Sequence, residues 1–271
     1  MILAIDIGNT NIVIGGIDEK KTYFIERVST IRTKTELEYA IDIKNVLDIY
    51  GYTVDDISGG IVCSVVPQIT NVMRVAAEKI LRREIMVVKS GLKTGLNILM
   101  DFPNQLGSDL VADAVAGITH YQVPLIIFDL GTATTVCVVD DKKNYIGGMI
   151  YPGLRVSLDA LTSNASQLQG VGLDSPERVI GKNTVDCMKS GILNSNAAAM
   201  DGIIDRIEEE LGKKATVLAT GGLAKTVVPL CRREIILDEE LLLKGMLTIY
   251  QKNRTAFAAP AEKGKGANPC E

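Results

Sequence analysis

The sequence of 271 residues has no excess of basic side chains, because its 29 Lys and Arg are outnumbered by 33 Asp and Glu. A chain with a formal net charge of −4 lacks the positive patch with which proteins bind phosphate backbones, so nucleic acid is not an expected partner. The sequence also lacks a Cys-x-x-Cys pair. Its cysteines are odd in number and widely spaced, which predicts neither a structural zinc site nor a disulfide framework. They are Cys63, Cys137, Cys187, Cys231 and Cys270.

Long apolar runs are also missing, and no segment approaches the length of a membrane span. The chain opens on the short apolar segment 1–5, which lacks the basic flank and the length of a signal peptide. Together with cysteines typical of a reducing compartment, these features predict a cytoplasmic protein without a membrane partner.

The common glycine-rich nucleotide signatures are absent as well. No Gly-x-x-x-x-Gly-Lys-Ser/Thr run exists, and no Gly-x-Gly-x-x-Gly follows a predicted strand. The signature set of protein kinases is missing too. The absence of these motifs therefore excludes a P-loop protein, a Rossmann dinucleotide-binding protein and a protein kinase.

What the chain does have is a 46% hydrophobic content, enough for a substantial core in two packed halves. The β-branched segments 2–5 and 12–17 are separated by a Gly-Asn turn and predict a β-hairpin. Helical periodicity follows at 35–50 and 68–83, on either side of a buried strand at 61–66. This order predicts a sheet with crossover helices, in an α/β fold.

The second half starts the same pattern again with the apolar segment 125–128. Residues 129–136 read Asp-Leu-Gly-Thr-Ala-Thr-Thr-Val and match residues 6–13, Asp-Ile-Gly-Asn-Thr-Asn-Ile-Val, position for position. We expect a second hairpin here, with Gly147 and Gly148 in its turn region.

Helical segments near 156–162 and 184–211 and a buried strand at 216–219 complete the repeat. We therefore predict two similar α/β halves, residues 1–122 and 123–254, facing each other across a central cleft. The segment 255–271 has almost no large apolar residue, and we expect a disordered or non-native tail.

An Asp at the end of a strand, followed by Gly and small polar residues, suits phosphate binding. The Gly lets the backbone approach a phosphate, while the carboxylate holds the ion that neutralises it. Asp6 would hold magnesium in this way, directly or through water. One such turn would be explained by local hydrogen bonds, but the second copy at Asp129 favours phosphate binding. Gly221 and Gly222 end a third strand and would let a base or ribose lie against bare backbone.

In this order and spacing, the three elements resemble the phosphate-1, phosphate-2 and adenosine motifs of the acetate and sugar kinase, Hsp70 and actin superfamily. A narrower resemblance, spanning residues 1–254, is to type III pantothenate kinase. It rests on Asp6-x-Gly-Asn-Thr-Asn, Gly107-Ser108-Asp109, Asp129-x-Gly-Thr-Ala-Thr-Thr, Gly147-Gly148-x-Ile-x-Pro152-Gly153, Ile180-Gly181-Lys182-Asn183-Thr184 and Thr220-Gly221-Gly222-Leu223-Ala224.

This resemblance implies a duplicated ribonuclease H-like (actin-like ATPase) fold around a nucleotide cleft. It implies transfer of a phosphoryl group from ATP to the primary hydroxyl of pantothenate, the first step of coenzyme A biosynthesis. The expected assembly is a homodimer that requires magnesium and a monovalent cation, potassium or ammonium.

The resemblance also assigns residues to roles. Asp109 would be the base and Asp129 would hold the monovalent cation. The nucleotide would be bound by Asp6, Ile7, Gly8, Asn9, Thr10, Asn11, Ile12, Val13, Thr132, Gly221 and Gly222. The substrate would be bound by Met100, Gly107, Ser108, Asp109, Leu110 and Thr184, the last by family analogy across the dimer interface.

Three positions depart from the family pattern around the acceptor. Leu110 replaces an Arg, Asp113 stands where Asn is typical, and Met100 stands where a Tyr is typical. Asp113 follows Asp109 by one helical turn, and we expect it to raise the proton affinity of Asp109. Lys93, Arg155 and Lys182 are candidates to replace the lost guanidinium.

Two alternatives to pantothenate phosphorylation remain at this point. A phosphoanhydride hydrolase of the same fold would use water as acceptor, but would leave Gly107-x-Asp109 and segment 181–184 unexplained. A non-catalytic nucleotide-binding regulator, like the Bvg accessory factor branch, is favoured by Leu110 and Met100. The lone His120 is expected to cap a helix.

Overall fold

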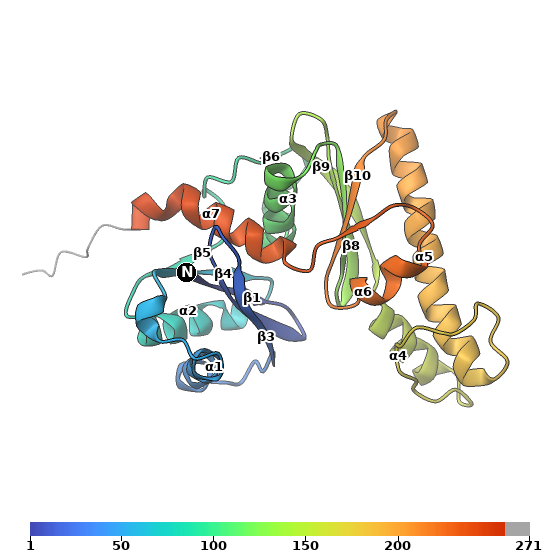
Figure 1. Cartoon of the computed structure of the whole chain (residues 1–271), viewed down its shortest axis with the longest axis horizontal. Helices are drawn as coiled ribbons and strands as arrows, with labels where there is room; N and C mark the ends of the chain where they lie inside the picture. Colours follow the sequence, from blue (N-terminus) through green and yellow to red (C-terminus); the bar gives the residue numbers. More distant parts are fainter. Residues whose placement is uncertain (258–271) are drawn as a thin grey trace, which may run out of the picture.

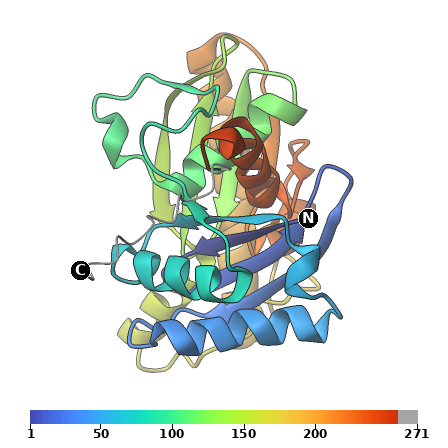
Figure 2. The same ribbon diagram turned by 90° about the vertical axis from the view of Figure 1, so that its left-hand side faces the viewer.

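The computed structural model describes residues 1–257, which form two β-sheets with helices packed between and outside them (Figure 1). The first sheet has the strand order β3-β2-β1-β4-β5. Its strands are β1 (Ile2–Ile7), β2 (Asn11–Ile17), β3 (Thr22–Ser29), β4 (Gly59–Ser64) and β5 (Ile85–Val87). The helices α1 (Glu36–Ile49) and α2 (Pro67–Leu81) cover one face of it, as Figure 2 shows.

The second sheet has the order β11-β10-β7-β8-β9-β6. Its strands are β6 (Asn97–Ile98), β7 (Leu125–Leu130), β8 (Ala133–Val139), β9 (Asn144–Pro152), β10 (Thr216–Thr220) and β11 (Ile236–Leu237). The outer face packs on α4 (Leu154–Asn164), α5 (Thr184–Leu211) and the short α6 (Ala224–Val227). Single 3₁₀ turns occur at Val54–Asp56, Pro103–Gln105 and Val228–Leu230. The predicted α/β class with two sheets is confirmed.

The helices α3 (Ser108–His120) and α7 (Leu241–Phe257) cross the middle of the molecule. α3 is buried over most of its surface, and it contacts β4 of the first sheet and both β7 and β8 of the second. Small residues permit this close packing: a Cβ on Gly245 of α7 would collide with the carbonyl oxygen of Ala112 in α3. The end of α7 includes residues 255–257 of the predicted tail, and the rest of that tail lies outside the described residues.

Alternation along β1 decides which way Asp6 points. Leu3, Ile5 and Ile7 pack in the cluster under α1 and α2, whereas Ile2 and Ala4 pack in the cluster around α3 and α7. Side chains of a strand alternate between the two faces. The side chain of Asp6 therefore faces α3, and the same alternation in β7 turns Asp129 towards α3 from the other sheet.

The two hairpins match less closely than their sequences. β1 and β2 are joined by residues 8–10, but β7 and β8 are joined only by residues 131–132. As a result Asp6 pairs with Val13, whereas Asp129 pairs with Thr135 and not with Val136. The predicted position-for-position equivalence holds up to the turn and then slips by one residue, which changes the side chains on each face.

The predicted place of Gly147 and Gly148 in a turn is wrong. Both lie within β9, opposite Val138 and Cys137. The turn is formed by residues 140–143 instead, where Asp140 Oδ1 accepts hydrogen bonds from the backbone N–H groups of Lys142 and Asn144. Gly148 is needed for a different reason, because a Cβ there would collide with the carbonyl of Val136.

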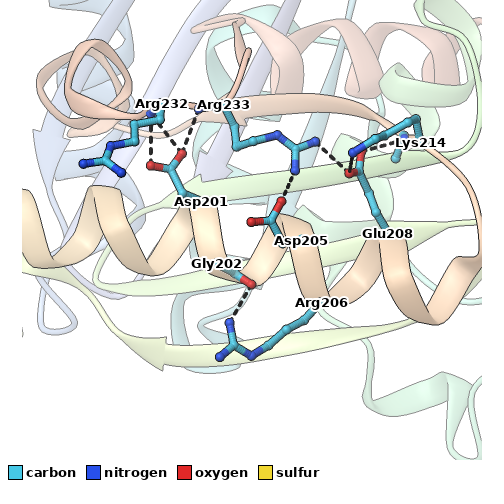
Figure 3. A network of polar contacts seen from close by, with 9 residues as sticks. Asp201, Gly202, Asp205, Arg206, Glu208, Lys214, Arg232 and Arg233 are labelled. Carbon is cyan, nitrogen blue, oxygen red and sulfur yellow. Dashed lines mark hydrogen bonds and ion pairs between the residues drawn. The ribbon is translucent and has the colours of Figure 1, made fainter.

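A polar network ties α5 to the segment between α6 and β11 (Figure 3). The carboxylate of Asp201 accepts hydrogen bonds from the backbone N–H groups of Arg232 and Arg233. The Arg233 guanidinium pairs with Asp205 and donates to Glu208 Oε2 at 2.7 Å. Burial alone would raise the pKa of Glu208, but its partners, Arg233 among them, hold that pKa below its usual range.

Two further predictions about the chain can be compared with the structure. None of the helices between residues 1 and 257 has the length and apolar character required to span a membrane. The described cysteines, Cys63, Cys137, Cys187 and Cys231, are free thiols, and Cys270 lies outside the described residues.

We expect Arg233→Ala to lower the free energy of unfolding by about 2 kcal/mol, because Glu208 is only 6% exposed and would lose a charged partner. A matched control is Lys213→Ala, which breaks the ion pair between Lys213 and Asp141. Both of these side chains are about half exposed. That change should cost less than about 1 kcal/mol. Urea unfolding of both variants measures the difference, and equal losses would contradict the structural role of Arg233.

Candidate active site

Asp6 and Asp129 occupy matching places in the two sheets. Each is the fifth residue of a six-residue strand, and each side chain faces α3. Asp6 is paired across the neighbouring strands with Val13 and Cys63. Asp129 is paired in the same way with Thr135 and Thr220. The ends of β1 and β7 and the start of α3 meet here, and we call this place the junction.

The two predicted phosphate turns touch each other at the junction. The hydroxyl groups of Thr10 and Thr132 lie within hydrogen-bond distance, at 3.0 Å, although the residues are 122 positions apart. Thr30 fixes the first turn, because its hydroxyl donates to the Gly8 carbonyl at 2.7 Å and its N–H donates to the Thr10 carbonyl. Gly153 N–H donates to the Thr132 carbonyl and fixes the second turn.

The predicted glycine turn after β10 also reaches the junction. Gly221 has a φ of +92°, a conformation that residues with a side chain rarely adopt. A Cβ at this position would collide with Asp129 Oδ1. Gly221 is therefore required both by its backbone conformation and by the close approach of Asp129.

Asp109 is in the first turn of α3, where its carboxylate Oδ1 accepts a hydrogen bond from the N–H of Leu110 at 2.8 Å. Gly107 leaves room for this carboxylate, since a Cβ on Gly107 would collide with Asp109 Oδ1. The hydroxyl of Ser108 donates to the Ser64 carbonyl at 2.9 Å and accepts from the Ser64 N–H. Ser108 thus anchors the start of α3 to β4.

Burial is the main reason why the pKa values of these carboxyl groups are higher than usual. Burial, together with the negative charges of Asp109 and Asp129, raises the pKa of Asp6 to about 8. The pKa of Asp129 is raised to about 6 by burial and by Asp109, while Arg27 opposes the shift. Burial also raises the pKa of Asp109, against the hydrogen bonds from backbone N–H groups. The junction thus brings together three predicted site residues that influence one another electrostatically.

Asp113 is the most deeply buried of the acidic residues near the junction, with 1% exposure, and its Oδ1 has no hydrogen-bond partner among the described residues. Burial raises its pKa well above the usual range, and the charges of Asp129 and Asp109 add to this. The charge of Asp109 is one cause of this raised pKa, so the two carboxyl groups interact electrostatically. The expected effect of Asp113 on the proton affinity of Asp109 stays a prediction.

The side chains of Leu110 and Met100 belong to an apolar cluster beside the junction. Leu110 is 9% exposed, and it packs in the cluster with residues such as Ala114 and Tyr145. The half-buried Met100 packs against the same cluster. The two side chains that depart from the family pattern therefore pack with other apolar side chains of the core.

Thr184 lies away from the other predicted site residues, at the start of α5 and at the end of that helix near α4 (Figure 1). It lines a cavity of about 510 Å³ together with Lys182, Asn183 and Cys187. The structure therefore separates Thr184 from Asp109 within one chain. The segment just before Thr184 also carries two exposed apolar side chains, Val179 and Ile180, which are at least 72% exposed.

Two arginines that no sequence motif singled out lie close to the predicted nucleotide residues. Arg32 Nη2 lies 3.4 Å from Asn9 Oδ1 in the first turn. Arg27 lies on β3 directly opposite Val13 and comes close to Gly222 of the other half. Alternation in the third strand could have placed Arg27 on the face of Asp6, but its approach to Gly222 depends on how the halves pack.

No group of three or more His, Cys, Asp or Glu residues within the described part of the chain is arranged to hold a metal ion. Asp6 and Asp129 remain single carboxylates, and Asp6 Oδ1 is buried without a hydrogen-bond partner in the described residues. A buried and unpartnered carboxylate oxygen suits a hard cation whose other ligands come from phosphate oxygens or water.

Comparison of the chain with solved structures supports the predicted actin-like ATPase fold. A structure described as a Baf family transcriptional activator from Campylobacter jejuni has a TM-score of 0.58 and 17% identity, covering 94% of this chain and 100% of that one. The activator of 2-hydroxyisocaproyl-CoA dehydratase from Clostridium difficile, solved with bound ADPNP, has a TM-score of 0.53 and 14% identity, covering 94% and 95%. At these identities the similarity concerns the fold.

Sequence comparison is more specific. A family model described as type III pantothenate kinase matches residues 2–206. A type III pantothenate kinase from Bacillus cytotoxicus is 43% identical over 253 residues, which cover 93% of this chain and 97% of the relative. The chain therefore belongs to the type III pantothenate kinase family.

Proposed function

We propose that this protein transfers the γ-phosphoryl group of ATP to the primary hydroxyl of pantothenate, the first step of coenzyme A biosynthesis. The observation that carries the proposal is the convergence of Asp6, Asp129 and Asp109 at one junction, in a chain of this family. Phosphoryl transfer depends mainly on positioning and charge stabilisation, for which turns and carboxylates are sufficient.

Asp109 acts as the base of the reaction. Its carboxylate accepts the proton of the pantothenate hydroxyl while the hydroxyl oxygen attacks the γ-phosphorus and ADP leaves. The position of Asp109 in the first turn of α3, where Gly107 leaves its carboxylate room, supports this role. Burial raises its pKa, which makes the carboxylate a stronger base when it is ionised.

The nucleotide binds at the junction, with its phosphates between the two turns. Gly8 and Asn9 present backbone and amide groups on one side and Thr132 presents its hydroxyl on the other. Because Thr10 and Thr132 are hydrogen-bonded to each other, the phosphates enter by separating these two hydroxyl groups. Gly221 and Gly222 would form the surface on which the nucleoside lies.

Asp6 would hold magnesium and Asp129 would hold a monovalent cation, potassium or ammonium. Such ions neutralise the charge that develops on the phosphates. The unpartnered Oδ1 of Asp6 and the raised pKa values of both carboxyl groups support these assignments, since a nearby cation would stabilise their ionised forms.

The functional unit is a homodimer in the cytoplasm. Thr184 contributes to pantothenate binding across the dimer interface, where Lys182 supplies a positive charge for the pantothenate carboxylate. The separation of Thr184 from Asp109 and the exposed apolar residues just before Thr184, Val179 and Ile180, support this arrangement. The free thiols of the described cysteines support a reducing compartment.

The direct test is production of ADP from magnesium-ATP in the presence of potassium, measured over a wide range of pantothenate concentrations. We expect ADP formation to depend on pantothenate and to saturate. ADP that forms at the same rate without pantothenate would refute the proposal and point to a hydrolase.

Replacing Asp109→Asn should lower kcat roughly 100-fold or more, because a general base contributes a factor of this order. ATP affinity should be unchanged, because the base interacts with the acceptor and not with the nucleotide. Steady-state kinetics and calorimetric ATP binding check the two expectations separately. Loss of ATP binding in this variant would contradict the assignment of Asp109 as a base.

The pH dependence of kcat/KM should show an acid limb, because Asp109 has to be ionised to accept a proton. Burial raises its pKa above the ordinary value of 3.8, so activity should fall as pH decreases through that raised pKa. Burial is the largest cause of this shift, so the Asp113→Asn variant should also show an acid limb. A profile that stays flat down to about pH 4 would argue against Asp109 as the base.

A further inference from the structure

Arg27 stands on the wall of the junction that belongs to the first sheet. It pairs with Val13 across β3 and β2, and Val13 pairs with Asp6 across β2 and β1. Directly opposed residues in neighbouring strands point to the same face of a sheet. The side chain of Arg27 therefore leaves the sheet on the face of Asp6, two strands away from it.

The guanidinium of Arg27 crosses to the other half of the molecule. Its Nη1 lies 3.6 Å from the position that a Cβ would take on Gly222, and its Nη2 and Cζ both lie 3.8 Å away. These are ordinary van der Waals distances, so the guanidinium lies against the Gly222 turn. Gly221, next to Gly222, lies against Asp129 Oδ1, so the guanidinium is near the second phosphate turn.

The guanidinium has no partner in the protein that would explain this position. Among the residues that the structure describes, no hydrogen bond or ion pair involves the Arg27 side chain, which is exposed. Two other arginines have a carboxylate partner, Arg233 in Glu208 and Arg74 in Glu78. An arginine that lies near Asp129 and is bonded to no carboxylate keeps its donors available for a ligand.

The charge of the site indicates what that ligand is. Asp6, Asp109 and Asp129 all face the junction, and a triphosphate would add further negative charge. A guanidinium offers paired donors that match two phosphate oxygens, and such bidentate contacts are stronger than neutral hydrogen bonds.

We propose that Arg27 is a nucleotide-binding residue that contacts the phosphate chain of ATP at the junction, between the first phosphate turn and the Gly221-Gly222 turn. The proposal rests on the proposed function in assuming that ATP binds at the junction. Because Arg27 belongs to one half and reaches the other, its contact with the phosphates also links the two halves when the nucleotide is bound.

The test compares ATP with adenosine, which shares the nucleoside but has no phosphate. Calorimetry on the full chain with magnesium should show that Arg27→Ala weakens ATP binding roughly 10- to 100-fold, in line with a lost charge-assisted contact. Adenosine affinity should be unchanged. Arg27→Lys should give an intermediate ATP affinity, because it retains the charge without the planar fork. The matched control is Arg83→Ala, which removes an exposed arginine of the same half and should alter neither affinity.

The outcomes separate the two proposals. Unchanged ATP affinity in Arg27→Ala would overturn the role of Arg27. An equal loss for ATP and adenosine would also overturn it, since that pattern indicates a structural contact with the Gly222 turn. If the wild type binds ATP but pantothenate does not stimulate ADP formation, the proposed function fails and the binding data still decide on Arg27. If the wild type does not bind ATP, both proposals are refuted.

Discussion

The junction depends on how it limits the repulsion between several carboxyl groups that are buried close together. Asp6, Asp109, Asp113 and Asp129 come from both sheets and from the helix between them, and burial raises the pKa of each. Such a cluster is stable only if some groups are protonated or if positive charges approach. Asp113 meets the first condition. Cations, and a guanidinium on the opposite wall, would meet the second when a nucleotide is bound.

The duplication supplies two walls with the same backbone but different chemistry. β1 and β7 each present an Asp at the same position, yet the second hairpin is one residue shorter. The slip puts Thr135 opposite Asp129, where Val13 lies opposite Asp6. The third strand of each hairpin shows the same difference. Arg27 pairs with Val13 in the first sheet, and Ile150 pairs with Thr135 at the equivalent place in the second. One wall therefore carries the guanidinium and the other carries the additional hydroxyl.

The acceptor side shows how an altered pocket can keep its fold. Leu110 and Met100 complete an apolar cluster instead of leaving a gap where polar residues are expected. Ser108 bonds to the backbone of β4 and fixes the start of α3, so the position of Asp109 does not depend on the residue that follows it. The local geometry of the base is thereby independent of the substitutions around it.

The sequence by itself determined the α/β class, the two halves and the strand-ending Asp residues, because hydrophobic periodicity and Asp-x-Gly turns are local signals. It also placed Asp109 at the start of a helix. Only the tertiary structure decided that the second hairpin slips by one residue, that Gly147 and Gly148 lie within a strand, and that Asp113 is buried with an unpartnered Oδ1. The approach of Arg27 to Gly222 and the separation of Thr184 from Asp109 were likewise beyond the sequence. These features depend on packing between residues far apart in the chain, and local patterns carry no information about such distances.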